Sequence, residues 1–94
     1  MAESFHIQVA TPEKLLVDSD AISAQIPAKS GYIGVLPGHA ALLSELGSGD
    51  FTYVTPANES HTMAVNGGYV EILGDNVRML TERPAPPVTN PSSK

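Results

Sequence analysis

Apolar and polar side chains alternate in several short segments of this chain. Apolar residues hold every second position in segments 5–9, 22–26, 70–72 and 77–79, with mostly polar or small residues between them. A period of two places one face of a β-strand against a core and the other face in solvent. Turn-forming residues separate the segments at intervals of about eight to twelve positions, which is typical of all-β proteins. The pattern therefore predicts one small all-β domain.

Two segments depart from simple alternation. The acidic sequence Asp18-Ser19-Asp20 interrupts what would otherwise be one long strand from Lys14 to Pro27. We interpret it as a bend or bulge that lets the strand pass from one sheet to the other. The segment 40–46 would form two helical turns by propensity, and its length fits a strand equally well. The residues alone leave both structures open there.

The end of the chain has a different composition. Residues 83–94 contain four prolines and no hydrophobic period. Proline has no N–H to donate to a sheet, so a segment this rich in proline is not expected to join one. We therefore expect a sandwich domain over residues 1–82 and an extended, disordered Pro-rich tail over residues 83–94.

Charge and composition exclude several classes of protein. The 94 residues carry a net charge of −5, five scattered Lys and Arg residues and no cysteine. The scarcity of basic residues argues against binding of nucleic acid or anionic membranes, and the lack of cysteine excludes disulfides, thiol catalysis and thiolate metal sites. No apolar run is long enough to span a bilayer, so no direct bilayer insertion is expected. The N-terminus resembles neither a signal peptide nor a transit peptide, which predicts a cytosolic bacterial protein or one already processed.

The most distinctive motif is the ten-residue sequence G-Y-I-G-V-L-P-G-H-A at positions 31–40. Gly31 and Gly34 are expected to adopt backbone angles that a residue with a Cβ would resist. Pro37 fixes its own φ, and Gly38 then turns the chain. His39 follows that turn and is free to contact a neighbour.

This motif resembles a known family when it is combined with three others. The opening segment 5–16, the double-glycine segment 64–72 and the segment 76–82 occur in matching order and spacing. Together they resemble the N-terminal domain of the epsilon subunit of F-type ATP synthases, called delta in mitochondria, over about residues 4–82. Asn66 stands where the family often has serine. The resemblance favours a strand over residues 40–46 and a flattened antiparallel β-sandwich of about ten short strands in two sheets.

The resemblance implies a function without catalysis or cofactor. The family member is a central-stalk (rotor) subunit that clamps the gamma subunit to the c-ring and so couples proton flow to rotation. It is peripheral on the cytoplasmic face of the bacterial inner membrane, or on the matrix or stromal side in an organelle. The family's C-terminal helical hairpin, which inhibits ATP hydrolysis and in some members binds ATP, is missing here. The sequence leaves open whether the hairpin was lost naturally or was removed. Neither inhibition of ATP hydrolysis nor ATP binding is expected of this chain.

The resemblance also implies roles for particular residues. The c-ring-facing turn would consist of Lys29, Ser30, Gly31 and Tyr32, and the gamma-facing residues would be His39 and Thr11. The residues expected to be structural are Gly31, Gly34, Pro37, Gly38, Gly67 and Gly68. Tyrosine is common both at the ends of sheets and at interfaces, so packing and partner contact stay open for Tyr32.

The histidine and aspartate residues do not predict a catalytic or metal site. His39 lacks any nucleophile–base motif around it, and the spacing of His6, His39 and His61 matches no closed set of metal ligands, so no catalytic or metal residue is expected. Asp18, Asp20 and Asp50 are interpreted as turn formers.

The double glycine and the overall composition leave one further alternative. Gly67 and Gly68 are interpreted as permitting a bulge or close strand contact, because no lysine and no helix follow them as in a phosphate-binding loop. The alternative class is a small β-sandwich ligand-binding module, which would need an aromatic-lined cleft. Aromatic residues make up only 5% of the chain and include no tryptophan, which disfavours it.

Overall fold

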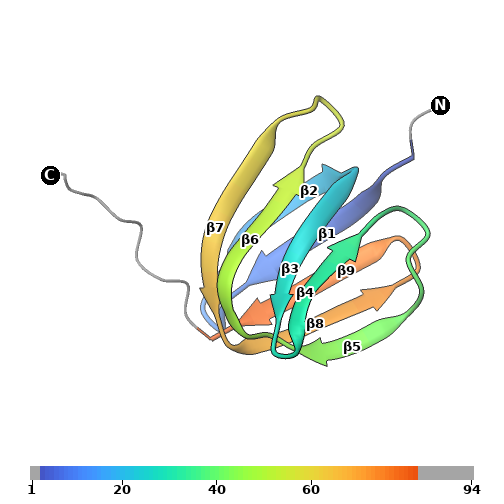
Figure 1. Ribbon diagram of the computed structural model, residues 1–94. Coiled ribbons are helices and arrows are strands. Elements are labelled where there is room, and N and C mark those ends of the chain that lie inside the picture. The colour runs from blue at the N-terminus through green and yellow to red at the C-terminus, as the bar shows by residue number, and fades with distance from the viewer. Residues whose placement is uncertain (1–2, 83–94) are drawn as a thin grey trace, which may run out of the picture.

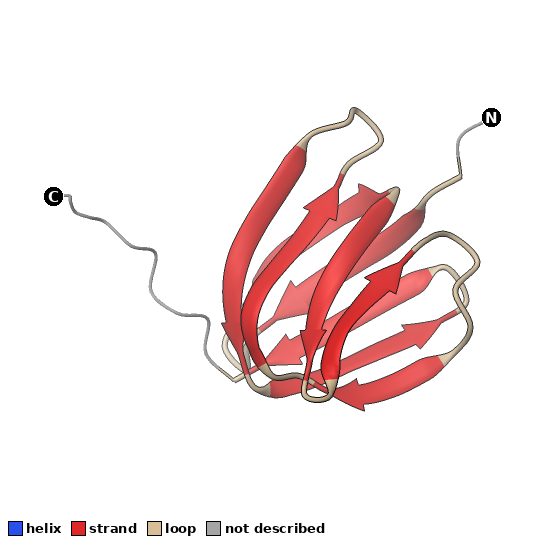
Figure 2. Ribbon diagram, in the orientation of Figure 1, coloured by secondary structure: helices blue, strands red, loops and turns tan. Residues whose placement is uncertain are grey.

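Strands make up the whole regular structure of the part of the chain described by the computed structural model, residues 3–82 (Figures 1 and 2). The expected tail over residues 83–94 lies outside this part. No helix that could cross a membrane occurs among the described residues. The strands are β1 (Phe5–Ala10), β2 (Leu15–Ala21), β3 (Ser23–Ala28), β4 (Gly31–Val35), β5 (Leu42–Glu45), β6 (Ser48–Val54), β7 (Ser60–Asn66), β8 (Gly68–Leu73) and β9 (Asn76–Thr81).

The strands form two sheets that pack face to face (Figure 1). Sheet A has the order β2-β1-β9-β8-β5, and sheet B has the order β4-β3-β6-β7. The predicted β-sandwich is confirmed, with nine strands in the described residues rather than about ten. One pair differs from the antiparallel prediction: β1 and β9 run parallel, from His6 opposite Asn76 to Ala10 opposite Leu80. Strand β9 lies between β1 and β8. It runs antiparallel to β8 and parallel to β1.

The core lies between the sheets and follows the predicted alternation. Inward positions of β1 and β9 are fully buried, whereas their outward neighbours are partly or fully exposed. Phe51 of β6 is the largest fully buried side chain. The aliphatic side chains buried with it come from both sheets and include Ile7, Val9, Ile26, Val35, Val65, Val70, Ile72 and Val77.

Within residues 3–82 the chain changes sheets four times, and the sequence interpretation misplaced the first change. The acidic sequence 18–20 lies inside the continuous strand β2, and the change of sheet occurs at Ile22. Asp18 and Asp20 point outward and contact His6 on the neighbouring strand, so they do not need a turn. The last change of sheet occurs at the double glycine, where Gly67 adopts φ = 75° and takes the chain from β7 in sheet B to β8 in sheet A.

The distinctive motif forms strand β4 and the loop after it. Gly31 (φ = 133°) and Gly38 (φ = 84°) adopt the left-handed backbone expected of them. Gly34 does not, and a Cβ there would meet no atom within 4 Å, so its expected conformational role was wrong. Residues 42–45 form strand β5, as the family resemblance predicted.

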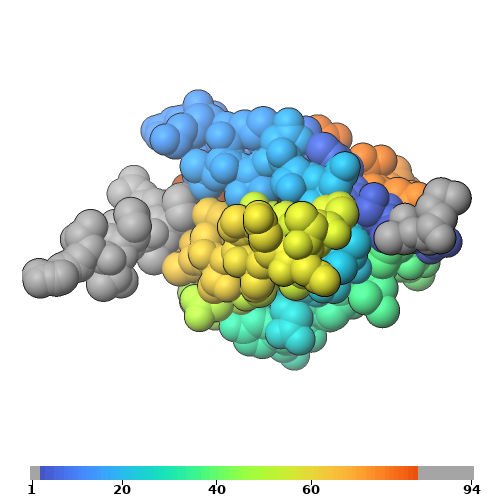
Figure 3. Space-filling view, turned by 90° about the horizontal axis from the view of Figure 1, so that it is seen from above, coloured from blue at the N-terminus to red at the C-terminus, as the bar shows by residue number. Residues whose placement is uncertain are grey.

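The β6–β7 loop, residues 55–59, lies at the opposite end of the sandwich from the Lys29–Ser30 turn (Figure 1). Asn58 adopts φ = 67° there, and the Thr55 N–H donates to the Glu59 carbonyl at 2.8 Å. In Figure 3 this loop (yellow) lies at the centre of the view, between β2 (blue) and the β4 region (teal to green).

Candidate partner-binding surfaces

The outer face of sheet A carries a row of apolar side chains across four strands. Register places Leu15 beside Ala10, Ala10 beside Leu80, and Leu80 beside Tyr69. We call these four residues the outer apolar row. Leu15, Leu80 and Tyr69 are each about half exposed, at 52%, 49% and 54%. A surface hollow of about 370 Å³ follows the row.

The rest of this face adds further apolar area and charged residues around it. Leu43 and Leu73 also project outward from sheet A and are largely exposed. Of the seven large exposed hydrophobic residues in the described part of the chain, five therefore lie on this one face. The outer apolar row is contiguous, and the pair Glu71–Arg78 separates it from Leu73. A contiguous apolar surface with charged or polar neighbours is typical of a protein-binding surface. The charged side chains on this face are Asp18, Asp20, Glu45, Glu71 and Arg78.

The sequence contained a signal for this face that the alternation analysis missed. Consecutive apolar pairs occur within strands, as in Ile72-Leu73 and Met79-Leu80. The first member of each pair is buried and the second is exposed. Two adjacent apolar residues in a strand must face opposite sides of the sheet. Such pairs therefore mark strands that are apolar on both faces.

A charged cluster lies on the same outer face, at the pairing of β1 with β2. The Nδ1 atom of His6 lies 3.1 Å from Asp20 Oδ1, and its Nε2 atom contacts Asp18 Oδ1. These hydrogen bonds, with Asp20 the stronger cause, raise the pKa of His6 above its ordinary value of 6.5. This cluster could not be derived from the sequence, because it depends on the register of β1 against β2.

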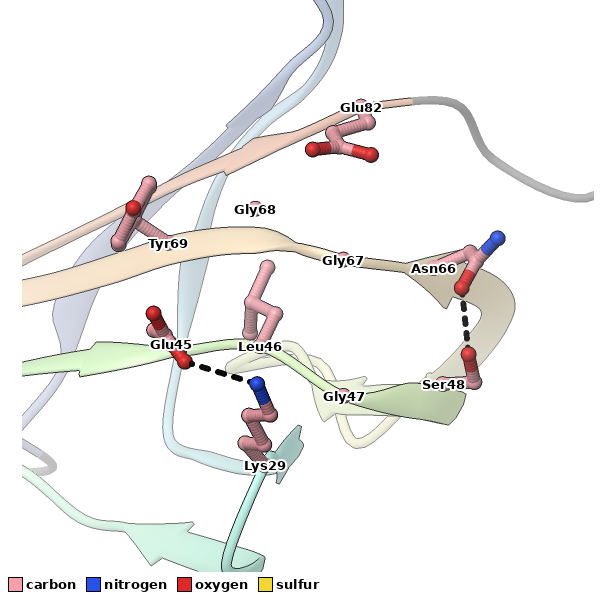
Figure 4. A pocket seen from close by; sticks show the side chains of 10 residues that line it. All are labelled: Lys29, Glu45, Leu46, Gly47, Ser48, Asn66, Gly67, Gly68, Tyr69 and Glu82. Atoms are coloured by element: carbon pink, nitrogen blue, oxygen red, sulfur yellow. Dashed lines mark hydrogen bonds and ion pairs between the residues drawn. The ribbon is translucent and has the colours of Figure 1, made fainter.

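A recess lies at the end of the sandwich, where the chain passes between the sheets (Figure 4). We call it the end recess. Its backbone floor is Gly47, Gly67 and Gly68, and its volume is about 270 Å³. Its polar wall contains the Lys29–Glu45 ion pair at 3.4 Å and a hydrogen bond from Ser48 to Asn66. Tyr69 and Glu82 complete the wall, so the recess adjoins the outer apolar row through Tyr69.

Gly68 begins β8 beside this recess, opposite Thr81 of β9. Its φ is 108°, and a Cβ there would lie 1.9 Å from the Leu80 carbonyl oxygen. The interpretation of the double glycine as a close strand contact is confirmed at Gly68. No larger residue fits here without moving β9.

The Lys29–Tyr32 segment begins as a turn at the same end of the molecule. Lys29 and Ser30 form the turn, and Gly31 and Tyr32 already belong to β4. The Tyr32 hydroxyl accepts a hydrogen bond from the Asp50 N–H at 3.1 Å and lies over Gly49. Asp50 lies within β6, so its interpretation as a turn former was wrong. Tyr32 therefore packs on β6, and 58% of it stays exposed for contact.

The two residues expected to face gamma lie in separate loops. Thr11 closes the β1–β2 turn, where its Oγ1 accepts hydrogen bonds from the N–H groups of Glu13 and Lys14. His39 lies between β4 and β5, and its Nδ1 contacts the Ala40 carbonyl at 2.7 Å. These loops are on opposite sides of the molecule in Figure 1. Only Thr11 is near the outer apolar row, since it follows Ala10.

The three histidines also lie on separate elements. His6 is in β1, His39 is in the β4–β5 loop, and His61 is in β7, where it stacks on Tyr53 with ring centroids 5.2 Å apart. Among residues 3–82, no group of three or more His, Asp or Glu side chains is arranged to hold a metal ion.

Comparison with known proteins places this fold in a family. The model of the family described as "ATP synthase, Delta/Epsilon chain, beta-sandwich domain" matches residues 4–86. Over 82 residues, or 87% of this chain, it is 46% identical to the ATP synthase epsilon chain of Solibacter usitatus and 44% identical to that of Koribacter versatilis. It covers 60% and 57% of those two proteins. The chain thus spans somewhat over half the length of these relatives.

Solved structures with the same fold have much lower sequence identity. A chain in the Euglena gracilis mitochondrial ATP synthase (OSCP/F1/c-ring) matches with a TM-score of 0.81 and 18% identity, over 88% of this chain and 53% of that chain. A chain in the Tetrahymena thermophila mitochondrial ATP synthase (central stalk/c-ring) matches with a TM-score of 0.71 and 15% identity, over 88% and 66%. At this identity the likeness establishes the fold alone.

Proposed function

Because the chain belongs to the ATP synthase delta/epsilon chain family, we propose that it is a non-catalytic rotor subunit of a proton-translocating F-type ATP synthase. Its sandwich contacts the gamma subunit on one side and the c-ring at one end. It thereby clamps gamma to the ring, so that proton-driven rotation of the ring turns gamma. The subunit is peripheral, on the cytoplasmic side of a bacterial inner membrane or the equivalent side in an organelle.

One observation carries this proposal: two unlike surfaces adjoin each other on a rigid sandwich. The outer apolar row offers apolar area to a stable protein partner, and the end with the Lys29–Ser30 turn offers polar groups. Tyr69 belongs to both. A subunit that joins two partners needs such an arrangement, since each partner then meets a surface of its own. We assign the apolar face to gamma and the polar end to the polar loops of the ring.

Rigidity is the mechanical requirement of a clamp. The two sheets enclose one continuous hydrophobic core that includes residues of both. Close-packed interiors have low compressibility and transmit strain. Torque on one face of the sandwich therefore reaches the other without the sheets sliding. No bond is made or broken in this function, so the side chains act only by position.

The alternative of a ligand-binding module has less support. The end recess and the hollow along the outer apolar row each contain one aromatic residue, Tyr69. A third hollow, on sheet B beside Gly34 and Leu36, contains none. A small-molecule site is usually apolar, aromatic-lined and concave. These hollows do not have that lining.

Cysteine crosslinking tests the proposed orientation. The chain has no cysteine of its own, so a single introduced thiol is unambiguous. We expect Tyr32→Cys to crosslink to a polar loop of the ring, and Leu80→Cys and Thr11→Cys to crosslink to gamma. His39→Cys tests whether the gamma contact extends to the β4–β5 loop. Co-purification with gamma but without crosslinks from these positions would mean that the sandwich is oriented differently, and failure to co-purify would refute the proposed function.

A further inference from the structure

The size of the end recess limits what can enter it. Its floor is backbone, because Gly47, Gly67 and Gly68 contribute no side chains there. Its volume of about 270 Å³ is below the range of roughly 300–1,000 Å³ that is usual for pockets holding drug-sized ligands. A single amino-acid side chain therefore suits it better than a cofactor does.

The charge of the recess favours a cation. Lys29 and Glu45 are an ion pair with 3.4 Å between Nζ and Oε1, so their charges largely cancel. Glu82 makes no ion pair with any other residue in the described range 3–82. Counting only residues 3–82, one carboxylate in the recess thus has no opposite charge paired with it, and it attracts a basic group and repels phosphate or carboxylate.

The position of Glu82 suits a planar cation. Its Oε1 lies 3.3 Å from the point that a Cβ on Gly67 would occupy, so the carboxylate lies against bare backbone. The half-exposed ring of Tyr69 lines the same recess (Figure 4). A guanidinium forms two parallel hydrogen bonds with a carboxylate and stacks on an aromatic ring, whereas an ammonium offers neither planar contact.

We propose that the end recess receives an arginine side chain of the protein that meets this end of the sandwich. The guanidinium pairs with the Glu82 carboxylate and stacks on the Tyr69 ring. This inference rests on the proposed function, in which that protein is the ring. It adds an anchor to the polar contact, because a charge pair that is shielded at an interface slows dissociation more than a charge pair at the rim.

Dissociation kinetics of two substituted subunits test the anchor. Each full-length variant is bound to ATP synthase that has been stripped of its own copy of this subunit, and the dissociation rate is measured. We expect Glu82→Gln to raise that rate about tenfold or more, because it leaves the arginine without its carboxylate. Tyr69→Leu, which keeps an apolar side chain in the outer apolar row, should raise it several-fold, and Tyr69→Phe should not.

Glu59→Gln is the matched control. It removes the same charge from the β6–β7 loop, at the opposite end of the sandwich, and should leave the dissociation rate unchanged. Melting temperatures of all variants should equal that of the wild type, so that a change in rate reports the contact. Wild-type dissociation rates for both Glu82→Gln and Tyr69→Leu would overturn the arginine anchor alone. A wild-type subunit that does not bind the stripped synthase would overturn the proposed function, and the anchor with it.

Discussion

Single glycines decide how closely the strands approach beside the end recess. A Cβ on Gly68 would overlap the Leu80 carbonyl oxygen, and its φ of 108° is one that L-residues rarely adopt. Gly34 has neither constraint, although it belongs to the most distinctive motif of the chain. The motif alone therefore does not reveal which glycines are structurally required.

Substitution of these glycines should separate them clearly. We expect Gly68→Ala to lower the free energy of unfolding by about 3 kcal/mol or more, since backbone strain and overpacking each contribute about 1–3 kcal/mol. Gly34→Ala should change it by less than about 1 kcal/mol, because the new methyl group enters open space. Chemical denaturation of both variants measures these values. Equal stability of Gly68→Ala and Gly34→Ala would contradict this expectation and would show that β9 can shift at Leu80 at little cost in free energy.

His6 should make stability depend on pH in a defined direction. Its hydrogen bonds with Asp20 and Asp18 raise its pKa in the folded state above the ordinary value of 6.5. Protonated His6 therefore contributes stability that is fully present below the unfolded-state pKa and is lost as the pH rises through the higher folded-state pKa. Denaturation of the wild type from about pH 6 to pH 8 should show this loss.

Two variants assign the pH dependence to the cluster. Asp20→Asn should reduce the loss of stability with rising pH, because it removes the main cause of the raised pKa of His6. His61→Gln, which removes a histidine from a different strand, should retain it. A pH profile that is unaltered by Asp20→Asn would contradict the assignment.

At the scale of elements, strands of this sandwich differ in how many apolar faces they have. β6 buries Phe51 completely in the core, and its other side chains face outward or are only partly covered. β5 instead exposes Leu43, which is 72% accessible, on the outer face of sheet A. An apolar side chain thus stabilises the core in β6, whereas in β5, as we propose, it contributes to partner binding.

Truncation of one apolar residue in each strand should show this division. Phe51→Ala should lower the free energy of unfolding by about 3–5 kcal/mol, because it leaves a cavity in the core. Leu43→Ala removes an exposed side chain and should change it by about 0.5 kcal/mol or less. Thermal or chemical unfolding distinguishes the two. A large loss for Leu43→Ala would mean that the outer face is covered in the free protein.

At the scale of the whole molecule, net charge and apolar surface act on different steps of association. The net charge of −5 should draw the chain toward basic partner surfaces over distances that salt screens. The outer apolar row, which we propose binds gamma, should hold the partner after contact in a way that is much less sensitive to salt. Electrostatic steering changes mainly the association rate, and close packing changes mainly the dissociation rate.

Binding kinetics at two salt concentrations should separate these effects. We expect the association rate with gamma to fall as ionic strength rises, and the dissociation rate to change by less than about twofold. Surface-based kinetic measurements with purified gamma provide both rates. A dissociation rate that rises tenfold between low and high salt would contradict an apolar clamp.

Much of the fold was predictable from the sequence, because strand burial follows local alternation. Apolar residues two positions apart in β1, β8 and β9 turned out to be the core. The turn at Thr11 and the glycines Gly31 and Gly38 were also predictable, since their conformations depend on their own residues. The segment 42–45 was ambiguous by propensity, and only the family resemblance identified it as a strand.

The surfaces proposed for partners could not be derived this way. The outer apolar row takes one residue from each of four strands, and only the register of those strands places the four side chains side by side.

Local alternation predicted the burial of apolar residues in β1, β8 and β9, and local residue chemistry predicted most turns, because both depend on residues within a few positions. Alternation did not predict the burial of Phe51 in β6. Only the tertiary structure decided which strands are neighbours, including the parallel pairing of β1 with β9 and the contact of His6 with Asp18 and Asp20. It also decided where the chain changes sheets; the first change occurs at Ile22 rather than at the acidic sequence 18–20. Pairing and crossing are set by contacts between distant segments, and the alternation within one strand is the same whichever strand lies beside it.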